Sequence, residues 1–168
     1  MPEPGAENEN FEQLMRESYR LVYQVAYSVL GNAEDAEEVA QETFLTAYRK
    51  FDSLRDASKF RPWVARASWR LALNYRRGAM RALGRDGAWM ATQAACETPE
   101  RLALEREFET LLKARVELLP AKLKAVVLLT GVEEMDIRTV AGILGIPEGT
   151  VRSRLHMARR QLLLEVMR

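Results

Sequence analysis

Apolar residues recur every three or four positions along most of this 168-residue chain, and this spacing limits the fold more than any other feature. Over residues 11–30, for example, Leu21, Val25 and Val29 would share one face of a helix. The alternation of apolar and polar residues that is typical of strands is nearly absent. The sequence therefore predicts an all-α protein.

The ends of the predicted helices carry capping signals. Gly31 can close the first helix because glycine tolerates a left-handed conformation. A second helix over residues 33–51 begins with acidic residues and ends with Arg49 and Lys50, the order that the helix dipole favours. A third helix begins near Pro62, because a first-turn proline needs no partner for its missing N–H group.

The helical spacing is interrupted once. Residues 84–98 lose their periodicity and contain two glycines, so we expect a linker there. Thr98 and Pro99 resemble the N-cap and first turn of a further helix, and Pro120 is typical of the start of another. The chain should therefore form two small helical domains joined by a linker.

The region from Asp136 to residue 155 has the pattern of a helix-turn-helix unit. Asp136 is expected to cap a short apolar helix, and Gly145 with Pro147 to turn the chain. The second helix is rich in arginine, which favours a role in DNA binding. A helical hairpin that does not bind DNA is the alternative that this pattern leaves open.

The net charge of +1 conceals blocks of opposite sign. Residues 1–60 carry twelve acidic and six basic groups, whereas residues 61–85 carry seven arginines and no acid. Residues 86–135 are acidic again, and residues 136–168 carry six basic and three acidic groups. The two basic blocks predict two nucleic-acid contacts, and the acidic ones indicate a surface for a basic partner.

Helical spacing places the charges of the third helix on one side. Positive groups without acids between them would repel one another unless anions were present, which favours contact with phosphates. Trp63 and Trp69 border this side, and each is expected to pack in the core. The residues on the polar side are Arg66, Arg70, Asn74, Arg77 and Arg81.

Two other helices present polar faces. The last helix should bury Val151, Leu155, Ala158 and Leu162 and turn basic and hydroxyl groups toward a major groove, without regular pairing of its arginines with acids. That side comprises Arg152, Ser153, His156 and Arg160, with Arg154 and Arg159 beside the apolar stripe. On the second helix an exposed row suits a basic protein helix, although such a row is often only solvated. This row comprises Asp35, Glu38, Gln41, Glu42 and Leu45.

Several function classes are disfavoured by the sequence. A single cysteine, Cys96, allows no internal disulfide, and one histidine offers little for a metal site. The sequence contains no paired histidine and carboxylate, no phosphate-binding glycine loop and no run of 18 apolar residues. The beginning of the sequence is unlike a secretory signal. We therefore expect a cytoplasmic protein that is not an enzyme and needs no cofactor or metal.

Three motifs resemble those of bacterial RNA polymerase sigma factors of the extracytoplasmic-function type, in the sigma-70 superfamily. The first is DAEEVAQETF at residues 35–44, followed by Tyr48, and the second is FRPWV at residues 60–64, followed by Arg66. The third is GIPEGTVRSRL at residues 145–155. The third alone occurs in other helix-turn-helix regulators, but all three in this order are highly specific.

The resemblance implies a division of roles along the chain. Residues 8–80 would form the N-terminal sigma domain, residues 81–97 the linker and residues 98–168 the C-terminal sigma domain. The DAEEVAQETF helix would bind the clamp helices of the polymerase beta-prime subunit, and the beta subunit, promoter DNA and an anti-sigma factor would be further partners. A loop before the arginine-rich helix would capture a base flipped from the minus-ten element.

The resemblance also assigns DNA contacts residue by residue. Those to the minus-ten element would come from Asp56, Lys59, Phe60, Arg66, Arg70, Asn74 and Arg77. Those to the minus-thirty-five element would come from Thr150, Arg152, Ser153, Arg154, His156, Arg159 and Arg160. Met157 stands where many relatives carry a basic residue, which puts one contact in doubt.

A stand-alone helix-turn-helix regulator that binds operator DNA without polymerase is the alternative function. It requires only the terminal motif, and it leaves the acidic row and the separate arginine-rich helix unexplained. Co-purification with core polymerase distinguishes the two.

Overall fold

The computed structural model describes residues 4–54, 56–82 and 105–166. They are helices and short connections, without a strand among them, in two compact units. The all-α prediction is therefore confirmed. Cys96, the Thr98 cap and Pro99 lie outside the described residues, as does nearly all of the predicted linker.

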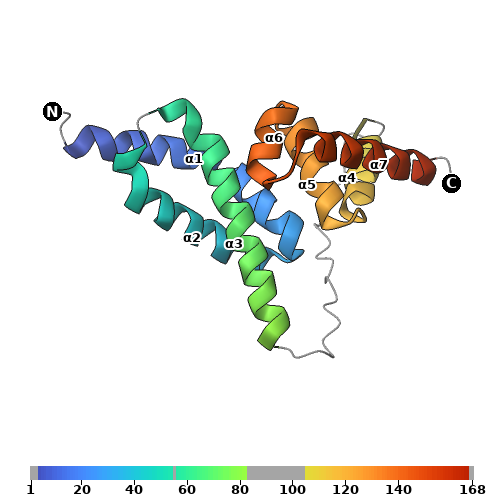
Figure 1. Cartoon of the computed structure of the whole chain (residues 1–168), viewed down its shortest axis with the longest axis horizontal. Coiled ribbons are helices and arrows are strands. Elements are labelled where there is room, and N and C mark those ends of the chain that lie inside the picture. Colours follow the sequence, from blue (N-terminus) through green and yellow to red (C-terminus); the bar gives the residue numbers. More distant parts are fainter. Residues whose placement is uncertain (1–3, 55, 83–104, 167–168) are drawn as a thin grey trace. The chain divides into compact units, whose positions relative to one another are not determined.

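The first unit contains three long helices, α1 (Pro4–Leu30), α2 (Ala33–Lys50) and α3 (Phe60–Ala82). Two 3₁₀ turns, η1 (Phe51–Ser53) and η2 (Ala57–Lys59), connect α2 to α3. Each of the three helices packs against the other two, with α3 lying across both α1 and α2 (Figure 1).

The turn between α1 and α2 follows from two adjacent residues. Gly31 adopts the left-handed conformation, with φ of 72°, and its N–H donates to the carbonyl of Tyr27 at 2.8 Å. Asn32 then caps α2, because its side-chain oxygen accepts from the N–H of Asp35 at 2.8 Å. The left-handed end predicted at Gly31 is confirmed.

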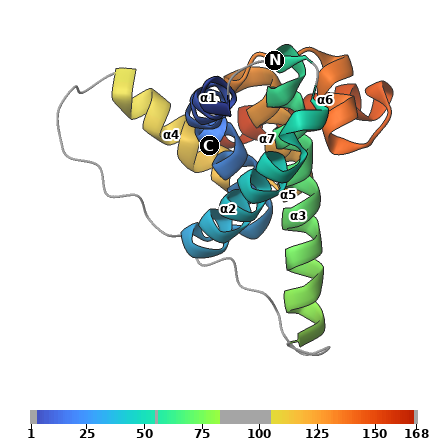
Figure 2. The ribbon, with the colours of Figure 1, turned by 90° about the vertical axis from the view of Figure 1, so that its left-hand side faces the viewer.

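The core of the first unit forms where the apolar stripe of α1 packs against α2 and α3. Figure 2 shows these three helices from a second side. On α1, Leu21, Val22 and Val25 are almost completely buried. On α2 the buried apolar residues are Ala36, Val39, Ala40, Phe44 and Ala47. Burial of each large apolar side chain contributes about 1.5–3 kcal/mol, so this stripe supplies much of the stability of the unit.

Three phenylalanines meet edge to face where the helices of this unit converge. The ring centroids of Phe11 and Phe51 are 5.1 Å apart, and those of Phe11 and Phe60 are 6.0 Å apart. Trp63 packs against the same cluster, and Trp69 is 7% exposed, so both tryptophans pack in the core as expected. The ring of Phe60 belongs to the core.

The second unit contains α4 (Glu105–Glu117), α5 (Ala121–Val127), the π-helical turn η3 (Leu128–Val132), α6 (Ile137–Leu144) and α7 (Glu148–Val166). Helix α7 packs against α5 and α6, and its buried face includes Val151 and Ala158. Leu155 and Leu162 of the predicted stripe are only half-buried. The helix predicted from Pro120 to about residue 130 is found as α5 and η3 together.

Helices α6 and α7 form the helix-turn-helix unit that the sequence predicts. The Asp136 carboxylate accepts from the N–H of Thr139 at 2.7 Å and so caps α6. Gly145 ends α6 in the left-handed conformation, with φ of 65°, and the N–H of Ile146 donates to the carbonyl of Ala141 at 3.1 Å. The tight turn that separates the two helices therefore depends on Gly145.

We expect Phe60→Ala to lower the free energy of unfolding of the first unit by about 3–5 kcal/mol, because it leaves a cavity at the contact of α1, α2 and α3. Tryptophan fluorescence of the full chain during urea denaturation measures this loss, since Trp63 and Trp69 both lie in that unit. Leu163→Ala is the control, because Leu163 is 63% exposed and its loss should change stability by less than about 0.5 kcal/mol. Equal stability of the two variants would contradict the role of the cluster.

Candidate nucleic-acid interface

The polar side of α3, which we name the arginine face, is exposed along the helix. It comprises Arg66, Arg70, Asn74, Arg77 and Arg81. No carboxylate pairs with these four arginines among the residues that the structure describes. The face extends over roughly 22 Å at a rise of 1.5 Å per residue. A row of unneutralised cations of this length is suited to a phosphate backbone.

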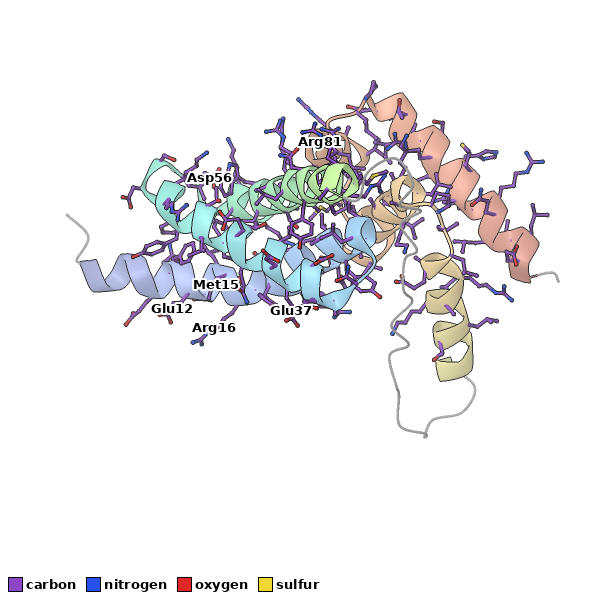
Figure 3. The ribbon with its side chains drawn as sticks, turned by 90° about the horizontal axis from the view of Figure 1, so that it is seen from below. Glu12, Met15, Arg16, Glu37, Asp56 and Arg81 are labelled. Atoms are coloured by element: carbon purple, nitrogen blue, oxygen red, sulfur yellow. The ribbon has the colours of Figure 1, made fainter. Side chains whose placement is uncertain are left out.

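The turn that leads into α3 places two of its three predicted DNA residues on the surface. Asp56 and Lys59 are exposed, and Asp56 lies before the start of α3 whereas Arg81 lies near its end (Figure 3). The Asp56 carboxylate accepts from the hydroxyl of Ser58 at 2.6 Å and from its N–H at 3.0 Å. These bonds hold the pKa of Asp56 below its ordinary value, so the turn has a fixed negative charge.

Phe60, the third residue of this turn for which a DNA contact is predicted, is not on the surface. Its side chain is only 1% exposed, because it packs edge to face against Phe11 and Phe51 instead of pointing toward solvent. Phe60 therefore acts as part of the core, and its contact with DNA stays a prediction.

A small cavity lies beside the same turn. It has a volume of about 60 Å³, and its lining includes Lys50, Ser53, Phe60 and Trp63. One water needs roughly 10–15 Å³ of such space, so the cavity has room for several water molecules. The sequence patterns did not indicate Lys50 and Ser53, because the residues around Ser53 have no helical periodicity.

Most of the predicted reading side of α7 is exposed. The exposed residues are Arg152, Ser153, His156, Arg159 and Arg160, while Thr150 and Arg154 are half-buried. The apolar residues Val151 and Ala158 are completely buried, as expected. Helix α7 therefore presents a basic surface in the second unit, as the sequence predicts.

One arginine of α7, Arg152, has an acidic partner on the same helix within the described residues. Its guanidinium lies 3.4 Å from the carboxylate of Glu148, one turn earlier. Glu165 pairs instead with Arg115 of α4 at 3.0 Å, beside a groove of about 170 Å³ that Leu118 and Leu162 help to line. Exposed pairs of this kind contribute only about 0–1 kcal/mol, so Arg152 can exchange Glu148 for an anion at little cost.

The acidic row on α2 is exposed at four of its five predicted positions. We name these four residues the acidic face: Glu38, Gln41, Glu42 and Leu45. Leu45 is 51% exposed and adds an apolar member. The prediction that Asp35 is exposed is wrong, because Asp35 is half-buried and its carboxylate is hydrogen-bonded within the unit. Its carboxylate accepts from the side-chain amide of Asn32 at 2.6 Å and from the hydroxyl of Tyr75 at 2.9 Å.

Tyr75 links the acidic face to α3, and the sequence patterns did not indicate this. Its hydroxyl also lies 3.2 Å from the carboxylate of Glu38. The hydrogen bond to Asp35, burial and the two negative charges raise the pKa of Tyr75 to about 12. Helical spacing puts Tyr75 on the side of α3 opposite the arginines, but spacing alone gives no indication of which helix that side meets.

Within residues 4–54, 56–82 and 105–166 no group of three or more histidine, cysteine, aspartate or glutamate side chains could hold a metal ion. No helix in these ranges is long and apolar enough to cross a membrane.

Comparison with known proteins matches both units. The family model of sigma-70 region 2 matches residues 14–82, and that of sigma-70 region 4 matches residues 110–162. The chain is 31% identical to the ECF RNA polymerase sigma factor SigW of Bacillus subtilis over 150 residues, which cover 84% of the chain and 80% of that protein. It is 30% identical to the RNA polymerase sigma-H factor of Pseudomonas aeruginosa over 162 residues, 84% of the chain and 82% of that protein.

Solved structures show the same similarity. The sigma factor RpoE of Bartonella quintana, crystallised with the anti-sigma factor NepR, superposes with a TM-score of 0.71 at 25% identity. The superposition covers 95% of this chain and 99% of RpoE.

We expect Asp136→Ala to lower the thermal unfolding midpoint at pH 7, because α6 loses its cap. The N–H of Thr139 holds the pKa of Asp136 below its ordinary value. The carboxylate therefore stabilises the fold above its ordinary pKa of about 4, and this contribution is lost as the pH falls through the lower folded pKa. Far-ultraviolet circular dichroism should show the difference from wild type shrinking in acid. The control Asp136→Asn keeps an acceptor and should lose less at pH 7, and a difference that grows in acid would contradict this account.

Proposed function

Because the chain belongs to the extracytoplasmic-function (ECF) family of RNA polymerase sigma factors, we propose that its three polar faces divide the work of that family. The protein is a sigma factor, which binds core RNA polymerase and directs promoter-specific initiation of transcription. The observation that carries the proposal is the presence of two exposed basic faces and one acidic face on two compact units.

The acidic face of α2 is the surface that we propose for the beta-prime clamp helices. Glu38 and Glu42 are exposed carboxylates one turn apart, and Leu45 adds apolar area beside them. Complementary charge of this kind steers association and fixes register, while a desolvated apolar residue adds affinity. Asp35 acts differently in this proposal, because its carboxylate accepts from Asn32, the cap of α2, and from Tyr75.

The arginine face of α3 and the turn before it are the surface that we propose for the minus-ten element. Arg66, Arg70 and Arg77 would follow the backbone of the opened strand, with Asn74 between them. A base flipped from the duplex would enter the cavity beside Ser53. The unstacking of a base costs a few kcal/mol, which stacking and phosphate contacts can offset, so melting needs no ATPase chemistry.

The exposed side of α7 is the surface that we propose for the minus-thirty-five element. Arginine can bond bidentately to the edge of guanine in the major groove, and Ser153 and His156 can donate to bases or phosphates. Arg152 is the first exposed arginine of α7, and in helix-turn-helix proteins the N-terminal residues of the second helix contact base edges.

The remaining parts of the proposal concern partners and place of action. The relative RpoE is held by an anti-sigma factor in its crystal structure, and we propose that an anti-sigma factor also holds this chain. Polymerase and promoter DNA are in the cytoplasm, so we propose that the chain acts there. The chain supplies binding surfaces in this proposal, and the polymerase performs the catalysis.

The double variant Glu38→Lys with Glu42→Lys should abolish binding to core polymerase and run-off transcription, because two carboxylates of the acidic face become cations. The affinity of core polymerase for the fluorescently labelled chain measures the first effect, and run-off transcription from a genomic fragment library measures the second. The control Glu12→Lys with Glu17→Lys makes the same change in net charge on exposed positions of α1 and should leave both near wild type. Operator binding by a wild-type chain that gives no start-site selection would instead support the stand-alone regulator.

We expect Arg152→Ala to weaken binding of the holoenzyme to the upstream promoter element by about 1–3 kcal/mol if Arg152 reads a base. Competition between promoter and unrelated DNA measures this discrimination. The control Glu148→Ala removes the ion-pair partner of Arg152 and should not weaken binding. A uniform loss over all DNA sequences would assign Arg152 to the phosphate backbone.

A further inference from the structure

The hydroxyl of Tyr75 is the point at which α3 reaches the acidic face of α2. It lies 2.9 Å from Oδ1 of Asp35 and 3.2 Å from Oε2 of Glu38. The ring is half-buried on the side of α3 opposite the arginine face. A single side chain of the DNA-binding helix therefore contacts a carboxylate that we assign to polymerase docking.

The two carboxylates around this hydroxyl are not equivalent. Asp35 is half-buried, and its second oxygen, Oδ2, accepts from the side-chain amide of Asn32 at 2.6 Å, so its orientation is fixed from two sides. Glu38 is exposed, and its only hydrogen-bond partner within the described part of the chain is the Tyr75 hydroxyl, whose single hydrogen it shares with Asp35. The conformation of Glu38 therefore depends on Tyr75.

The conformational freedom of the Glu38 side chain affects the affinity of docking. A glutamate side chain loses rotamer freedom when a partner fixes it, and that loss reduces affinity. A hydrogen bond present before binding removes part of this cost. Because Tyr75 uses Oε2, the other carboxylate oxygen, Oε1, is left for a cation of the partner.

We infer that Tyr75 is a positioning residue for core polymerase, which orients the Glu38 carboxylate on the acidic face through its hydroxyl. The inference rests on the proposed role of the acidic face. It adds a residue of α3 to a docking function that the sequence motif assigns to α2 alone. It also means that one hydrogen bond joins the docking surface to the helix that carries the arginine face.

A double-mutant cycle tests the inference. The affinity of core polymerase is measured for the full-length wild type, Tyr75→Phe, Glu38→Ala and the double variant, with thermal unfolding of each as a check on folding. Tyr75→Phe keeps the ring and removes only the hydroxyl, and it should weaken binding about three- to tenfold, the size of one hydrogen bond. In the Glu38→Ala background it should weaken binding less than about twofold, because the oriented carboxylate is gone.

The outcomes separate this inference from the proposed function. If Glu38→Ala alone binds like wild type, the docking assignment itself fails. If Glu38→Ala weakens binding while Tyr75→Phe has no effect, or has the same effect in both backgrounds, Tyr75 has no positioning role. Tyr19→Phe is the matched control, because the Tyr19 hydroxyl has no hydrogen bond within the described residues, and it should bind like wild type.

A second pair of variants tests the same point with Tyr75 and the core intact. Glu38→Asp keeps the charge but withdraws the carboxylate from the Tyr75 hydroxyl, so it should weaken binding about three- to tenfold. Glu37→Asp makes the same shortening at an exposed glutamate of α2 that lies outside the acidic face and has no hydrogen-bond partner in the described chain, and it should change binding less than about twofold. Equal effects of the two shortenings would overturn the inference.

Discussion

The edge-to-face contact of Phe11, Phe51 and Phe60 is the constraint on which the first unit depends. It joins α1 to the end of α2 and the start of α3. A rigid helix that is fixed at its first residue and packed along its length against two others has little freedom to rotate about its axis. The direction in which the arginines point is therefore decided by an aromatic contact that none of them makes.

Charge is distributed over the first unit so that neither functional face neutralises the other. The arginines of α3 lie on one side of that helix, and Tyr75, on the other side, contacts the carboxylates of α2. An uncharged phenol can lie between two carboxylates, whereas an arginine there would have consumed the negative charge that a basic partner needs. The same helix can therefore face DNA on one side and support protein docking on the other.

The sequence was sufficient to predict the helices, the caps at Gly31 and Asp136 and most of the exposed faces, because each depends on residues within one or two turns. The sequence did not predict the contacts of Phe60, Asp35 and Tyr75, and the reason is the same for all three. Helical spacing shows which residues share a face, but the residue that a face meets on another helix depends on how the helices cross. The pairing of Arg152 with Glu148 is local and could have been read from their spacing of four residues.

Gly145 has a consequence for how DNA sequence specificity can change. A Cβ atom at this position would meet no atom within 4 Å, so what the turn requires is only the positive φ of 65°. A residue that cannot adopt this φ would straighten the turn and tilt α7 relative to α6. The angle at which α7 enters a groove, and so which base pairs come within reach, would then shift although every side chain that reads DNA stays the same.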